Sequence, residues 1–191
     1  MSTYPLLSSD SHIIEPPDLW THRIDRAFTA RAPRLIHEAE ADQWYADGVK
    51  FGAIGINQQA GVRFATPEAL TLQGRMATVP RGGYDPHAHV QDMDRDTVAG
   101  GVLYPSQGLT TYRIPDSALL SAIFRAYNDW LADFCQPYPQ RLVVYTTAAD
   151  NSLNPKTRYN VLLTPSSAGA LPWYQPSFST TSGLWRWCAS S

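Results

Sequence analysis

The pattern of apolar and polar positions alternates between segments that favour strands and segments that favour helices. Residues 4–12 predict a strand with an apolar start and a polar end. Residues 86–99 and the segment that begins at Asp116 predict helices, each preceded by an aspartate that can cap the first turn. Residues 101–105 and 142–145 predict two further short strands. This alternation is typical of an α/β protein with a parallel sheet or barrel.

The helix that follows Asp116 is the clearest element of the chain. Apolar residues recur along one face of it at intervals of three and four: Leu119, Leu120, Ile123, Tyr127, Trp130, Leu131 and Phe134. In the shorter helix Pro86 takes the first position, and we expect Gly100 and Gly101 to end that helix. Residues 21–84 show no sustained period, which predicts an irregular insertion or a binding region, with 44–64 as a candidate partner-binding stretch.

The character of the sequence changes after about residue 145. Residues 151–191 contain no aspartate or glutamate, but they contain eight serines, four threonines, four prolines and three tryptophans. We therefore divide the chain into residues 1–145 and an irregular tail, residues 146–191. Our hypothesis is that the tail is translated out of frame or comes from a misjoined gene; the alternative is a genuine divergent tail.

Composition and charge narrow the classes of function. Hydrophobic residues make up 43% of the 191 positions, and the net charge of −2 provides no basic surface for nucleic acid. The first residues lack the features of a signal peptide, and no run reaches the ~18 apolar residues of a membrane span. Cys135 and Cys188 form no CxxC motif, so we expect free thiols and a cytoplasmic protein.

The polar end of the first predicted strand carries the candidate metal site. Asp10 and His12 lie two residues apart, and strand side chains at this spacing point to the same face. A carboxylate and an imidazole that converge can share one divalent cation, and zinc accepts both kinds of ligand. A D-x-H pair by itself also fits a plain polar strand end, so its sequence context matters.

That context closely resembles bacterial amidohydrolase-related proteins, which are similar to aminocarboxymuconate-semialdehyde decarboxylase. Three blocks carry the resemblance in the order and spacing of the family: residues 8–20; residues 82–86, 92–96 and 102–105; and residues 125–131. The resemblance covers roughly residues 5–144 of the chain. It implies an α/β fold that is the N-terminal portion of a TIM-like (β/α)8 barrel, incomplete and followed by the irregular tail.

The resemblance also implies a function and a site. The family consists of metal-dependent hydrolases and carboxy-lyases (decarboxylases), so the substrate would be a small organic acid or amide. Asp10 and His12 match the strand-one ligands of the family's divalent metal, which we expect to be zinc, with manganese or magnesium as alternatives. Glu15 would orient a ligand without binding the metal. We expect a homo-oligomer that binds neither nucleic acid nor membranes.

Several features of the family have no counterpart in this chain. None of the five histidines lies beyond residue 89, so the later metal ligands and the proton-transferring aspartate are missing, and no catalytic residue can be assigned. A barrel of this class usually needs ~250 residues. The alternative is therefore a non-catalytic fragment with an incomplete metal site. His87 and His89 fall within a predicted helix, ~200° apart around its axis, so we expect them to face solvent.

Overall fold

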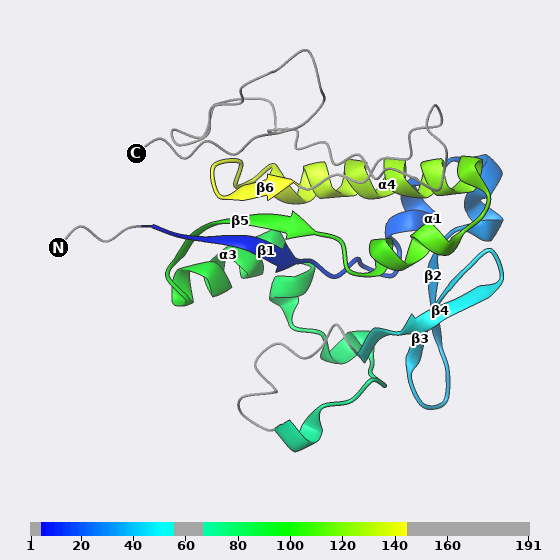
Figure 1. Cartoon of the computed structure of the whole chain (residues 1–191), viewed down its shortest axis with the longest axis horizontal. Helices are drawn as coiled ribbons and strands as arrows, with labels where there is room; N and C mark the ends of the chain where they lie inside the picture. Colours follow the sequence, from blue (N-terminus) through cyan, green and yellow to red (C-terminus); the bar gives the residue numbers. More distant parts are fainter. Residues whose placement is uncertain (1–4, 56–66, 145–191) are drawn as a thin grey trace, which may run out of the picture.

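The chain folds around a parallel sheet that two helices connect (Figure 1). The computed structural model describes residues 5–55 and 67–144. In the order β1-β5-β6, the sheet contains β1 (Leu6–His12), β5 (Val98–Tyr104) and β6 (Leu142–Val144), all parallel. Helix α3 (Pro86–Arg95) leads into β5, and helix α4 (Ser117–Cys135) leads into β6. The α/β class and the parallel sheet predicted from the sequence are confirmed.

The pairing of β1 with β5 contains an irregularity that includes Asp10 of the candidate metal pair. Ser8 lies opposite Gly101 and Ser11 opposite Leu103, so β1 advances by three residues over a stretch in which β5 advances by two. A bulge of this kind locally bends the strand and re-aims side chains. Regular pairing resumes at Ser11, and His12 lies opposite Tyr104 at the carboxyl end of both strands.

Helix α3 begins as predicted but ends earlier. The Asp85 carboxylate accepts hydrogen bonds from the backbone N–H groups of His87 and Ala88, and Pro86 is the first helical residue. The helix ends at Arg95, not near residue 99, because Thr97 adopts a φ of 58° that a right-handed helix cannot contain. Val98 and the two glycines after Ala99 therefore belong to β5.

Helix α4 confirms the strongest periodicity in the sequence. The Asp116 carboxylate caps it by accepting from the backbone N–H groups of Ala118 and Leu119. One face is buried against the sheet and α1 (Leu19–Arg23), where it joins Leu103 of β5 and Leu142 of β6 in the main core. A smaller cluster, formed by Ile14, Ile54 and Val79, lies beside it.

The prediction that residues 21–84 are irregular is wrong for much of this segment. It contains a three-stranded antiparallel sheet of β2 (Arg34–His37), β3 (Asp42–Ala46) and β4 (Val49–Ala53). Asp47 and Gly48 turn between β3 and β4 with φ angles of 51° and 75°, the two positive values that a tight hairpin turn requires. The described residues of this segment also form short 3-10 helices: η1 (Arg26–Arg31), η3 (Pro67–Ala69), η4 (Met76–Thr78) and η5 (Arg81–Gly83).

Arg31 fastens this antiparallel sheet to α4. Its guanidinium donates two hydrogen bonds to the Asp47 carboxylate, at 2.6 and 2.8 Å, and one to Asp116, at 2.8 Å. The β3–β4 turn and the first turn of α4 are thereby held to one side chain. Within the described part of the chain, no helix is long and apolar enough to cross a membrane.

Two buried tryptophans at the junction of the sheets provide a matched test of one hydrogen bond. Trp20 and Trp44 meet edge to face at 5.4 Å, and the Trp20 Nε1–H donates to the Ile123 carbonyl of α4. Trp44 Nε1 has no hydrogen-bond partner among the residues that the structure describes. We expect Trp20→Phe to lower the free energy of unfolding by about 1 kcal/mol more than Trp44→Phe, as measured by urea denaturation. Equal losses would contradict the assigned bond.

The Arg31 junction predicts a stability that depends on pH. Hydrogen bonds from Arg31 hold the pKa of both Asp47 and Asp116 below the ordinary value of 3.8. A carboxyl group with a lowered folded-state pKa stabilises the fold above its ordinary value, and that contribution is lost as the pH falls through the lowered value. Arg31→Met should therefore destabilise the protein near neutral pH, and the difference from wild type should shrink below pH 3.8.

Urea denaturation at several pH values, followed by tryptophan fluorescence, measures this difference. Arg34→Met is the matched control, because the Arg34 guanidinium donates to the backbone carbonyl of Ala30. A difference between Arg31→Met and wild type that stays constant down to acid pH would contradict the assigned role of Arg31.

Candidate functional site

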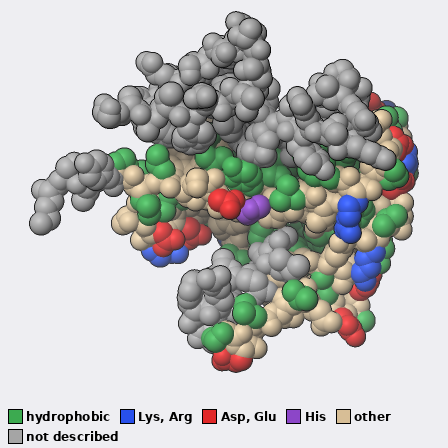
Figure 2. Space-filling model, in the orientation of Figure 1, with side chains coloured by type: hydrophobic (Ala, Val, Ile, Leu, Met, Phe, Trp, Pro, Cys, Tyr) green, Lys and Arg blue, Asp and Glu red, His purple; other side chains and the backbone are tan. Residues whose placement is uncertain are grey.

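Asp10 and His12 lie next to each other at the carboxyl end of β1, on a solvent-open part of the molecule. The Asp10 side chain is 75% exposed and the His12 side chain 44% exposed. Figure 2 shows acidic and histidine side chains meeting on this open face, among surroundings that are mostly apolar or uncharged. The structure therefore brings the two predicted side chains together, with Asp10 Oδ1 3.4 Å from His12 Nε2.

The backbone of the segment after β5 orients the His12 ring. His12 Nδ1 lies 2.8 Å from the Pro105 carbonyl oxygen, which can only accept a hydrogen bond, so Nδ1 carries the proton. In the neutral imidazole, Nε2 then holds the free lone pair, and this is the nitrogen that faces Asp10. A backbone carbonyl at the second ring nitrogen is a common way to orient a histidine that binds metal.

The separation of the two donor atoms is compatible with a shared cation. At 3.4 Å, Asp10 Oδ1 and His12 Nε2 are beyond the usual range for N–H···O bonds. Two ligands of a tetrahedral zinc ion, each ~2.05 Å from the metal, lie about 3.3 Å apart. The pair could therefore accept a metal ion with little rearrangement of either side chain.

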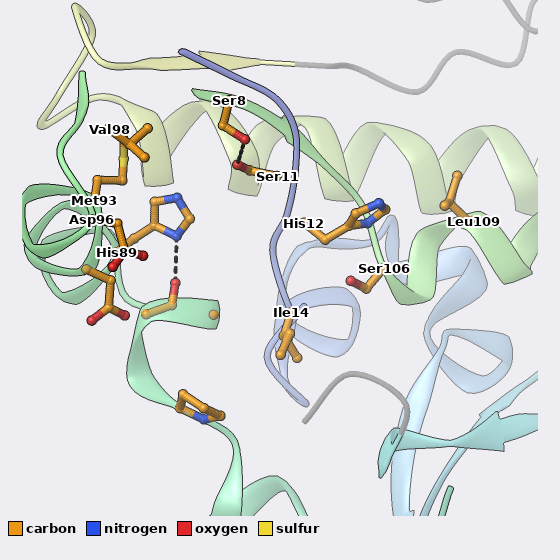
Figure 3. Close-up of a pocket in the computed structure, with 14 residues that line it drawn as sticks. Ser8, Ser11, His12, Ile14, His89, Met93, Asp96, Val98, Ser106 and Leu109 are labelled. Atoms are coloured by element: carbon orange, nitrogen blue, oxygen red, sulfur yellow. Dashed lines mark hydrogen bonds between the residues drawn. The ribbon is translucent and has the colours of Figure 1, made fainter. Parts of the chain in front are cut away.

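A cavity of about 680 Å³ runs along β1 beside the pair. Its walls come from β1, from η5 and α3, from Val98 at the start of β5, and from residues that follow β5. In Figure 3, His12 points toward Ser106 and Leu109, whereas His89 lies on the other side of β1. The cavity is large enough for a small organic molecule, and His12 forms part of its wall.

The described residues offer no third metal ligand at this point. Within residues 5–55 and 67–144, no group of three or more histidine, cysteine, aspartate or glutamate side chains could hold one metal ion. The donor types of the pair fit a divalent metal, but the pair contributes two ligands, whereas catalytic zinc sites have three protein ligands.

Glu15 is a buried residue next to the candidate pair. The sequence indicated that it orients a ligand but did not reveal its hydrogen-bond partners. Its side chain is 0% exposed, and its two oxygens accept hydrogen bonds from the backbone N–H groups of Gln107, at 2.9 Å, and Gly108, at 2.8 Å. Burial raises the pKa of this carboxyl group above its ordinary value, although the two backbone hydrogen bonds act in the opposite direction. Glu15 thus contacts the chain that follows Pro105.

Tyr127 of α4 is a second buried polar group, and sequence reasoning placed it only in the apolar stripe. Burial, and after it the charge of Glu15, holds the pKa of the Tyr127 phenol well above its ordinary range. Among the described residues, its hydroxyl has no hydrogen-bond partner. Neither the hydrophobic period nor a motif reveals such a group, because tyrosine at that position satisfies the pattern as an apolar residue.

The expectation that both helical histidines face solvent is wrong for His89. His87 is exposed, and its Nδ1 lies 2.9 Å from the Tyr138 hydroxyl. His89 is partly buried and its Nδ1 donates to the Gly82 carbonyl at 2.7 Å. Its ring also meets Phe134 edge to face. His89 therefore joins α3 to η5 and to α4.

Comparisons with known proteins support the fold. No protein-family model matches the chain, and no curated protein matches it. Among solved structures, the chain is similar to an amidohydrolase from Mycobacterium avium subsp. paratuberculosis K-10, with a TM-score of 0.53 and 19% sequence identity. The similarity covers 76% of this chain and 42% of that one. The described part of the chain therefore has an amidohydrolase-like fold and spans less than half the length of that structure.

The buried position of Cys135 predicts that its thiol does not react in the folded protein. The residue is fully buried, and burial raises the pKa of its thiol to about 12. Because the thiolate is the reactive form, we expect no reaction with a thiol reagent at neutral pH until the chain unfolds. The test uses a Cys188→Ser background, with Cys135→Ala added as the blank. Rapid labelling of Cys135 in the native protein would contradict this prediction.

Proposed function

We propose that Asp10 and His12 are two ligands of one divalent metal ion at the carboxyl end of β1. Zinc is the metal that best suits one oxygen and one nitrogen ligand, with manganese or magnesium as alternatives. The observation that carries this proposal is the hydrogen bond from His12 Nδ1 to the Pro105 carbonyl, because it leaves Nε2 directed at Asp10.

The same proposal extends to the architecture and the class of reaction. The sheet β1-β5-β6 would be the opening of a (β/α)8 barrel that belongs to a metal-dependent hydrolase or carboxy-lyase. Parallel strand order, the amidohydrolase-like fold and the position of Asp10 and His12 at the carboxyl end of a strand all support this interpretation. Residues 145–191, which include the predicted tail, lie outside the described residues.

A bound metal would polarise a carbonyl or carboxyl oxygen of the substrate, or activate a water molecule. The contribution of this chain would be to hold the ion with Asp10 and His12 and to fix the His12 tautomer with Pro105. The substrate would be a small organic acid or amide in the cavity beside the pair. Assembly into a homo-oligomer and a cytoplasmic location stay predictions from the sequence.

A second candidate function follows from the number of ligands. In the described ranges no third ligand joins the pair, so the chain could be a non-catalytic member of this fold that binds metal weakly. The two candidates differ in stoichiometry and affinity: an active site retains one metal per chain through purification, whereas an incomplete site loses it on dialysis.

Both candidates predict zinc binding at one site that depends on both members of the pair, and they differ in its strength. Titration of the full chain with Zn²⁺ against a chelating dye should give one site, and Asp10→Ala or His12→Ala should each weaken it about tenfold or more, or by at least about 1.4 kcal/mol. Full wild-type affinity in His12→Ala would exclude the pair as the metal site.

Asp18 and His22 provide a matched control within the same chain. They form a second aspartate–histidine pair, with His22 Nδ1 3.2 Å from Asp18 Oδ2, and both side chains are exposed on the surface at α1. Because this pair lies on a separate element, His22→Ala should leave the zinc affinity unchanged. A loss of affinity in His22→Ala as large as in His12→Ala would indicate nonspecific binding to surface histidines.

A further inference from the structure

His12 is the last residue of β1, and Glu15 follows it three residues later. Both residues contact the same short segment of the chain. His12 Nδ1 donates to the Pro105 carbonyl, and Glu15 accepts from the backbone N–H groups of Gln107 and Gly108. These contacts lie more than 90 residues apart in the sequence. The segment 105–108 is therefore held at one end by His12 of the candidate metal pair and at the other by Glu15.

We propose that Glu15 is a positioning residue for the Asp10–His12 pair. It holds segment 105–108 in place, and the Pro105 carbonyl of this segment then fixes the tautomer of His12. The inference rests on the proposed metal role of the pair for its functional meaning. The effect of Glu15 on which His12 nitrogen carries the proton can be tested without any metal.

The start of η6 (Gln107–Arg113) shows why this carboxylate matters. A helical turn leaves its first backbone N–H groups without partners inside the helix, and a side chain at the N-cap often satisfies them. Here the N-cap residue, Ser106, makes no such side-chain bond. Glu15 supplies both acceptors from the end of β1 instead. Without it, two buried N–H groups would lose their partners, at a cost that favours a shifted segment.

Close packing leaves this segment little room to relax by itself. A Cβ atom added at Gly108 would lie 2.9 Å from Pro105 Cβ and 3.2 Å from Glu15 Oε1. Both distances are shorter than ordinary contacts, so a side chain there would have to displace either the Pro105 ring or the Glu15 carboxylate. Glycine at 108 thus permits the approach by which Glu15 reaches the backbone.

The test reads the His12 tautomer directly, in the metal-free full chain. Long-range ¹H–¹⁵N NMR distinguishes the Nδ1–H from the Nε2–H form, and His12→Asn identifies the signal. In the neutral imidazole, we expect wild-type His12 to be in the Nδ1–H form. Glu15→Gln replaces one acceptor by an amide NH₂ that faces a backbone N–H, so we expect a mixture of the two tautomers.

Asp116→Asn is the control, because Asp116 also accepts two backbone N–H groups at a helix start, and its other hydrogen bond comes from Arg31 instead of from segment 105–108 or His12. It should leave the His12 tautomer unchanged. Gly108→Ala is a second variant that keeps the carboxylate and displaces the segment, and it keeps the proposal testable if Glu15→Gln does not fold. It should shift the tautomer in the same direction as Glu15→Gln.

A parallel titration with Zn²⁺ alone connects the tautomer to function. Loss of an orienting contact near a metal ligand typically weakens metal binding by about 10–100-fold, and we expect Glu15→Gln to fall in this range. An unchanged His12 tautomer in folded Glu15→Gln or Gly108→Ala would overturn the positioning role. If wild type binds no zinc, the proposed metal function fails, but a tautomer shift in Glu15→Gln still supports the positioning role.

Discussion

The carboxylate of Glu15, buried between the chain that leaves β1 and the chain that leaves β5, is the contact on which the geometry of the site depends. A buried carboxyl group is costly unless its oxygens are hydrogen-bonded, and here each oxygen accepts one backbone N–H. This requirement fixes the distance between the two strand exits. Because parallel strands end on the same side of a sheet, that distance also decides where the Pro105 carbonyl meets His12.

The sequence predicted the elements whose signals are local and repeated. The parallel strands and α4 follow from apolar runs, an amphipathic period and the capping aspartate at 116. The end of α3 could not be read, because the break depends on a positive φ at Thr97, a residue with no special preference for that conformation. Strands β2 to β4 are four or five residues long, too short for a period to emerge, although the Asp47–Gly48 pair is a hairpin signal.

For the site, spacing was sufficient to predict that Asp10 and His12 come together, since residues two apart on a strand share a face. The two side chains meet although the bulge between Ser8 and Ser11 includes Asp10. The groups that give the pair its orientation could not be found in this way. Pro105 and Gln107 contribute backbone atoms, which carry no signature in the sequence, and both meet their partners across more than 90 residues. Glu15 could be suspected from its motif, but the depth of its burial is a property of the fold.

In the proposed site, the orientation of the ligands and the number of ligands depend on different parts of the structure. Pro105 and Glu15 orient His12 through contacts that involve no metal, so the cost of ordering the imidazole is met by folding. In the proposed metal site, affinity would be limited by the two donor atoms of Asp10 and His12, because the described residues contain no group of three metal ligands. If a third ligand were brought to the open side of the pair, His12 would already be in the tautomer that binds metal. The affinity of the site for metal would then rise without any rearrangement of β1.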